Sequence, residues 1–122
     1  NDLPKAYIVP GSNALMTKME KGYVKGITAT APGFFGPQGR VLRLDLAYPD
    51  LNDRISDFRY ENYRITNFEM ETSALYGLSK ALGHNAMTVC AIIANRLRKE
   101  YAKDYKPSVT ALIEDLLEKL AH

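Results

Sequence analysis

The sequence has little of the residues that build disulfides and metal sites. Cys90 is the single cysteine in 122 residues, which excludes an internal disulfide and a cysteine-based zinc cluster. His84 and His122 are the only histidines, so we expect no histidine metal site. Because Cys90 lies within the apolar run 86–94, we predict a buried structural thiol rather than a nucleophile.

Strong charge and long hydrophobic runs are also missing. Sixteen basic and fourteen acidic side chains give a net charge of +2, which offers no polyelectrolyte signal for nucleic acid or a membrane surface. No basic segment followed by an apolar one opens the chain, and no apolar run approaches membrane-spanning length. We therefore expect a cytoplasmic protein that contacts neither nucleic acid nor membrane.

What the sequence does contain is an alternation of strand-like and helix-like segments. Apolar residues recur at strand or helix spacing along most of the chain. We predict strands over 23–30, 41–46, 63–70 and 85–95, and helices over 13–21, 51–58, 71–83 and 107–120. The nearly continuous apolar run within 85–95 is typical of a central strand that is covered on both faces.

These segments indicate a layered α/β domain of which only part is present. The strands are too few for a complete sheet, and the opening residues 1–5 lack an initiator methionine. We therefore expect residues 1–122 to form half of one domain.

Two carboxylates bracket a methionine in the stretch 67–72, where strand-like alternation gives way to helical spacing. Glu71 falls at the predicted helix N-terminus, where unpaired N–H groups and the helix dipole favour an anion. One interpretation is that Glu71 only stabilises this helix and that Met70 fills the core. Glu69 is predicted on the same face as Glu71, however, and two adjacent acids are costly without solvent, a cation or a ligand hydroxyl. A sugar diol is a suitable partner, because a carboxylate accepts hydrogen bonds from neighbouring hydroxyls.

A second informative stretch is the loop 31–40, which is rich in proline and glycine and follows a predicted strand. It matches neither glycine-rich pattern that cradles phosphates. One interpretation is that Phe34 and Phe35 anchor the loop to the core while Gln38 and Arg40 are solvated. The alternative is that a planar heterocycle stacks on a phenylalanine and that the amide and guanidinium bind its polar edge.

The chain contains four motifs whose order and spacing resemble those of the uridine phosphorylases, in the nucleoside phosphorylase family. They are Gly26-Ile-Thr-Ala-Thr30, Phe34-x-x-x-Gln38-x-Arg40, Asn67-Phe-Glu-Met-Glu71 and Ile93-Ala-Asn95-Arg96. The resemblance covers most of residues 13–122 and corresponds to the C-terminal half of the family's domain. It implies a three-layer α/β/α architecture with a central mixed sheet.

The resemblance implies a role for each matching residue near the base. Phe34 would stack on the uracil, while Gln38 and Arg40 would bind its carbonyl and imide edge. Arg96 would lie near the uracil 4-carbonyl, through Arg40 or a water molecule. Purine-specific relatives carry an acidic residue at the position of Arg96. The absence of an acid at this position therefore favours a pyrimidine nucleoside as the substrate.

The resemblance also implies how the sugar is held and what else the reaction needs. Glu69, Met70 and Glu71 would hold the ribose, with Glu71 on the 2′ and 3′ hydroxyls. Inorganic phosphate is the co-substrate, and no metal or organic cofactor is expected. The family's phosphate site belongs to the other half of the domain and to a neighbouring subunit, so this chain alone is expected to be inactive. Family members are oligomers, often hexamers built from dimers.

Two other functions stay open from the sequence. The first is a phosphorylase or hydrolase of other nucleosides. The second is a catalytically silent module that binds a nucleoside or supports assembly.

Overall fold

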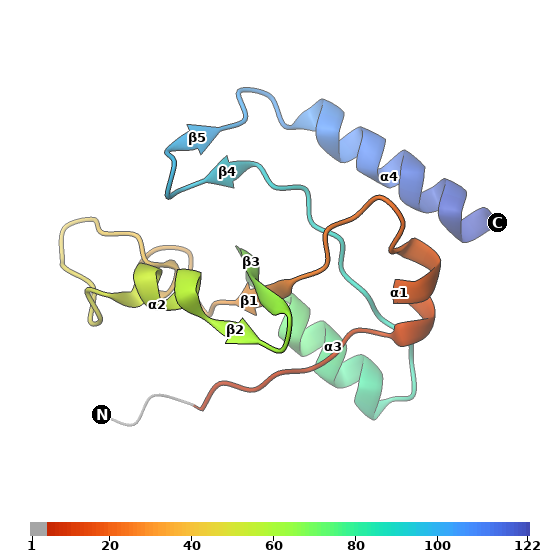
Figure 1. Ribbon diagram of the computed structural model, residues 1–122, viewed down its shortest axis with the longest axis horizontal. Coiled ribbons are helices and arrows are strands. Elements are labelled where there is room, and N and C mark those ends of the chain that lie inside the picture. The colour runs from red at the N-terminus through yellow and green to blue at the C-terminus, as the bar shows by residue number, and fades with distance from the viewer. Residues whose placement is uncertain (1–4) are drawn as a thin grey trace.

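The computed structural model describes residues 5–122 (Figure 1). Residues 1–4, on which part of the expectation of a fragment rests, lie outside the described residues. Strands and helices alternate along the chain, which confirms the α/β class. The elements are α1 (Asn13–Met19), β1 (Ile27–Thr30), the 3-10 turn η1 (Gly36–Gln38), α2 (Leu51–Asp57), β2 (Arg59–Tyr60), β3 (Tyr63–Glu69), α3 (Thr72–Ala81), β4 (Ala94–Asn95), β5 (Glu100–Tyr101) and α4 (Lys106–Ala121).

A small mixed sheet carries the part of the structure that positions the candidate site. Its strand order is β1-β3-β2, with β1 parallel and β2 antiparallel to β3. Thr30 pairs with Glu69, so β1 and β3 end side by side. The segments that leave these two strands therefore begin at the same edge of the sheet.

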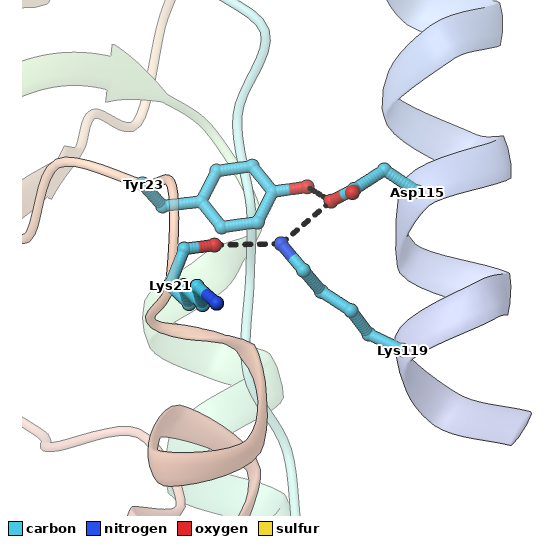
Figure 2. Close-up of polar contacts among 4 residues, drawn as sticks. All are labelled: Lys21, Tyr23, Asp115 and Lys119. Carbon is cyan, nitrogen blue, oxygen red and sulfur yellow. Dashed lines mark hydrogen bonds and ion pairs between the residues drawn. The ribbon is translucent and has the colours of Figure 1, made fainter. Parts of the chain in front are cut away.

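The C-terminal helix α4 is held against the α1 region by a polar cluster (Figure 2). The Lys119 ammonium donates to the Lys21 carbonyl at 2.7 Å and lies 2.8 Å from Asp115. The Tyr23 hydroxyl also donates to Asp115, and this hydrogen bond raises the pKa of the tyrosine. Hydrogen bonds from Lys119 and Tyr23 in turn lower the pKa of the Asp115 carboxyl. These contacts fix the C-terminal helix α4 against the segment that follows α1.

The core is thin for a chain of this length. Among the described residues, Met19 and Ala31 are the only buried apolar side chains, and no large side chain is fully buried. Large apolar residues are exposed on α3, after it and on α4, including Leu82 at 69% exposure. A domain normally buries such side chains against a second layer. The chain therefore leaves apolar surface that its own described elements do not cover.

The predicted central strand over 85–95 is wrong for most of its length. Only Ala94–Asn95 pairs, as β4 in a short antiparallel hairpin with β5. Residues 86–93 run from α3 to β4 without a partner strand among residues 5–122 (Figure 1). Ile92 and Ile93 are exposed, and Cys90 is half-buried rather than buried. An apolar run becomes a strand only when another strand accepts its backbone hydrogen bonds.

Two other predicted strands are also corrected. Residues 41–46 form bends instead of a strand, and the side chains of Val41, Leu42 and Leu44 are exposed. The strand predicted over 23–30 is limited to Ile27–Thr30, because only these residues pair with β3. Alternating apolar residues favour a strand, yet pairing with a neighbour decides whether one forms.

Gly26 offers a test of how closely β3 approaches the start of β1. A Cβ at Gly26 would lie 2.3 Å from Thr66 Cγ2 and 2.9 Å from Thr66 Cβ. We expect Gly26→Ala to lower the free energy of unfolding by about 1–3 kcal/mol, because the strand pair must shift. Gly77→Ala is the control, since α3 leaves open space there and alanine should stabilise the helix by about 0.5–1 kcal/mol. Denaturant unfolding measures both variants, and an unchanged midpoint in Gly26→Ala contradicts this packing.

Candidate functional site

The candidate site lies at the edge of the sheet where β1 and β3 end (Figure 1). The loop 31–40 follows β1, and the junction 69–72 joins β3 to α3. Ligands of open α/β sheets bind at the carboxyl ends of strands, where departing loops meet. The fold therefore brings together the two stretches that the sequence singles out.

The loop after β1 is closed on itself by backbone hydrogen bonds. The N–H groups of Gln38 and Arg40 both donate to the Phe35 carbonyl, at 3.0 and 3.1 Å. Gly39 adopts a left-handed backbone (φ 72°), which glycine reaches without steric cost. This turn brings the Arg40 guanidinium over the ring of Phe34, with its central carbon 3.7 Å from the ring centroid.

Helix α2 supports the loop from outside. The Asn52 side-chain amide donates to the Gly39 carbonyl at 3.1 Å. A Cβ at Gly39 would lie 2.1 Å from the Asn52 amide oxygen, so the close approach requires glycine there. The loop is therefore held in one shape before any ligand enters.

Gln38 is the centre of a cluster that includes both arginines predicted for the site. It is 4% exposed, and its amide oxygen accepts from Arg40 at 2.8 Å and from Arg96 at 3.3 Å. Arg96 also donates to the Gln38 backbone carbonyl, across 58 residues of sequence. Burial and the nearby Arg40 charge lower the pKa of Arg96. Two guanidinium groups held this close make the edge electropositive and suited to oxygen atoms that carry negative charge.

Both phenylalanines of the loop are about half exposed, at 52% for Phe34 and 53% for Phe35. They contact each other edge to face, with ring centroids 5.3 Å apart. The interpretation in which they anchor the loop to the core while Gln38 is solvated is therefore wrong. An exposed aromatic face beside two arginines is instead available to stack on a planar ring.

Glu69 stabilises the start of α3, a role that the sequence suggested for Glu71. Its carboxylate accepts the backbone N–H groups of Glu71 and Thr72, both at 2.6 Å. It also accepts the hydroxyl of Thr30. Burial alone would raise the pKa of Glu69, but these hydrogen bonds outweigh it and lower the pKa. The carboxylate is therefore ionised at neutral pH.

Glu71 and Met70 are exposed next to the hydrogen bonds that the Glu69 carboxylate accepts. Glu71 is the residue that precedes the first turn of α3, yet its side chain makes no capping hydrogen bond. Met70 is 41% exposed, so it does not fill the core. The crowding expected of two neighbouring acids is relieved because Glu69 is bound by the protein, which leaves the Glu71 carboxylate open to a ligand.

Sequence reasoning assigned no role to two residues that shape the site. Thr30 donates to Glu69 from the adjacent strand, and Asn52 supports the loop from α2. Their partners lie 39 and 13 residues away. A threonine at a strand end and an asparagine in a short helix carry no signal of such contacts until the register of β1 against β3 is known.

Other kinds of site are not found in the part of the chain that the structure describes. Residues 5–122 contain no group of three acidic, histidine or cysteine side chains that could hold a metal ion. In the same range, no helix is long and apolar enough to cross a membrane.

Comparison with known proteins identifies relatives of this arrangement. No family model matches the chain. A uridine phosphorylase from Thermococcus kodakarensis is 35% identical over 100 residues, which is 81% of this chain and 35% of that protein. The predicted resemblance to the uridine phosphorylases is confirmed by this match.

A solved structure agrees with the sequence relative. The crystal structure of a Trypanosoma brucei nucleoside phosphorylase, described as showing uridine phosphorylase activity, matches with a TM-score of 0.84 and 26% identity. The chain has a nucleoside phosphorylase fold. The match covers 93% of this chain and 42% of the trypanosomal one. The chain therefore spans between a third and a half of the length of either phosphorylase.

Proposed function

We propose that the chain is the base- and ribose-binding half of a uridine phosphorylase. The reaction is phosphate-dependent cleavage of the N-glycosidic bond of uridine to uracil and ribose 1-phosphate. The observation that carries this proposal is that the loop with the Gln38 cluster and the turn with the exposed Glu71 carboxylate leave the same edge of the sheet. One end of the site suits a polar planar base, and the other suits a sugar diol.

The base end accounts for the chemistry of the departing uracil. As the glycosidic bond breaks, negative charge develops on the uracil carbonyl oxygens. Donors aimed at these oxygens stabilise the transition state more than the ground state. Arg40 and Gln38 supply such donors, and Arg96 contributes by holding Gln38 in place through two hydrogen bonds. Phe34 offers the exposed ring face on which the base stacks.

The sugar end fixes the ribose for attack. The Glu71 carboxylate accepts hydrogen bonds from the 2′ and 3′ hydroxyls, and Met70 packs under the ring. Both side chains are exposed at the end of β3, close to the loop that follows β1. Holding the sugar and the base in one orientation lowers the entropic part of the barrier. Glu69 belongs to the same ribose-binding stretch.

The phosphate site is proposed to lie outside this chain, in the rest of the domain and in a neighbouring subunit of a homo-oligomer. This proposal is supported by the coverage of the relatives and by the thin core. We infer that the remaining half of the domain covers the exposed apolar side chains and pairs with residues 86–93. The complete enzyme would serve pyrimidine nucleoside salvage in the cytoplasm without an organic cofactor.

A catalytically silent nucleoside-binding module is the second candidate. The observation that favours it is that the chain spans only part of each relative while the residues for base and ribose are together at one edge. Such a module would bind uridine without cleaving it. A phosphorylase or hydrolase of other nucleosides is the third candidate. The test below separates a uridine phosphorylase from a uridine hydrolase and from the silent module.

Uracil release from uridine, with and without phosphate, tests the proposed function. The measurement compares the 122-residue chain with a polypeptide that contains it together with the rest of the domain. We expect phosphate-dependent release by the complete polypeptide alone, because the phosphate site is proposed to lie outside the 122-residue chain. Release without phosphate would indicate a hydrolase, and binding without release would indicate the silent module. Full activity of the 122-residue chain would contradict the half-site proposal.

Arg40→Ala in the complete polypeptide tests the base end of the site. We expect kcat/KM for uridine to fall on the order of a hundredfold, the usual scale for losing a donor that stabilises developing charge. Arg43→Ala is the matched control, because Arg43 is exposed on the same segment and is assigned no role. Steady-state kinetics measure both variants. Equal activity in the two would remove Arg40 from the base site.

A further inference from the structure

Thr30 occupies a position that joins three elements at the end of the sheet. It is the last residue of β1 and pairs in register with Glu69, the last residue of β3. Its hydroxyl donates to one Glu69 carboxylate oxygen and accepts the Ser73 backbone N–H at 3.0 Å. A hydroxyl has one proton to donate and two lone pairs, so the donor and one acceptor position are in use. The hydroxyl therefore ties β1 to β3 and to the first turn of α3.

The Glu69 carboxylate extends this connection to the residue that faces the ribose. Its second oxygen accepts the N–H groups of Glu71 and Thr72, both at 2.6 Å. With the bond from Thr30, three of the roughly four lone-pair positions of the carboxylate are occupied by the protein. Little capacity remains for two ribose hydroxyls. The carboxylate holds the backbone of Glu71 directly.

Among the described contacts, Glu71 is held through its backbone alone: its N–H donates to Glu69 at 2.6 Å, and its carbonyl accepts the Leu75 N–H at 3.2 Å. The residue has a non-helical backbone (φ −129°, ψ −27°), and its side chain makes no capping hydrogen bond. The lowered pKa of Glu69 agrees with a carboxylate that is stabilised by several donors, despite the opposing effect of burial. Removing one donor would leave the 69–72 turn with fewer constraints and displace the Glu71 carboxylate.

We propose that Thr30 and Glu69 are positioning residues that set the place of the Glu71 carboxylate for ribose recognition, without touching the substrate. This inference rests on the proposed ribose contact of Glu71. It assigns a role to Thr30. It also changes the role of Glu69, which would not bind the ribose directly but would hold the backbone of Glu71, the residue that does. We therefore expect changes at Thr30 or Glu69 to weaken recognition of the ribose and to leave recognition of the base intact, because Gln38 and Asn52 hold the base site separately.

The test compares kcat/KM for uridine and 2′-deoxyuridine in the complete polypeptide. We expect Thr30→Val to lower kcat/KM for uridine about tenfold, the scale of one hydrogen bond to a charged group. The fall in kcat/KM for 2′-deoxyuridine should be clearly smaller. This substrate has no 2′-hydroxyl, so displacing the Glu71 carboxylate removes no hydrogen bond to that position. Thr30→Ser keeps the hydroxyl and should retain the wild-type ratio of the two substrates. Thr28→Val is the matched control, because its hydroxyl is on the same strand but bonds Asn67 at 3.1 Å.

Two further variants keep the test decisive if Thr30→Val unfolds the protein. Glu69→Gln keeps one acceptor oxygen and replaces the other with an NH2 group that only donates, so it should reduce the preference for uridine in the same way. Glu71→Gln provides the reference for losing the ribose contact itself. Circular dichroism at the assay temperature establishes that each variant is folded.

Several outcomes overturn the inference. Equal losses for uridine and 2′-deoxyuridine in Thr30→Val would mean that the hydroxyl only stabilises the fold. A loss in Thr28→Val of the same kind would mean that any hydroxyl on this strand has this effect. An unchanged substrate ratio in Glu71→Gln would remove the ribose contact, and the inference with it. Absence of phosphate-dependent cleavage in the wild type would remove the proposed function as well.

Discussion

The parallel pairing of β1 with β3 is the constraint on which the rest of the site depends. Its register sets Thr30 beside Glu69, so the loop after β1 and the turn before α3 begin at neighbouring points. Neighbouring strands in a sheet lie about 4.8 Å apart, which is within the reach of side chains across the ladder. A slip of one residue would turn Thr30 and Glu69 to opposite faces and break the connection to α3. Gly26 permits this register, because a side chain there would collide with Thr66.

Positive charge lies at the base end of the site and negative charge at the sugar end. At each end, one side chain accepts hydrogen bonds from the protein and so positions its charged neighbours: Gln38 at the base end and Glu69 at the sugar end. Gln38 is almost fully buried and receives hydrogen bonds from Arg40 and Arg96, so the two guanidinium groups are gathered in spite of their repulsion. Glu69 receives hydrogen bonds from the backbone of the α3 turn, so the neighbouring Glu71 carboxylate is exposed. A nucleoside has a matching division, with carbonyl oxygens on the base and donor hydroxyls on the sugar.

The sequence predicted the elements that are stabilised locally and failed where a partner strand is needed. Helices near 13–21, 51–58, 71–83 and 107–120 are all present, since helical hydrogen bonds close within each segment. The strands predicted over 41–46 and 85–95 depend on neighbours, and no segment of residues 5–122 pairs with them beyond the β4–β5 hairpin. The stretches 31–40 and 67–72 were found from their residue types, and the resemblance to a known family added a role for each residue. The contact of Thr30 with Glu69 was not found, because it exists only through the register of two strands that are distant in sequence.

A structure of the complete enzyme with bound uridine tests the central claim most directly, namely that one sheet edge binds the base and the sugar together. The account predicts the uracil ring against Phe34, with Gln38 and Arg40 at hydrogen-bond distance from its polar edge. It also predicts the ribose hydroxyls on the Glu71 carboxylate, with Glu69 still bound to Thr30 and the α3 turn. Uridine bound away from this edge, or with its ribose at the arginines and its base at Glu71, would contradict the account.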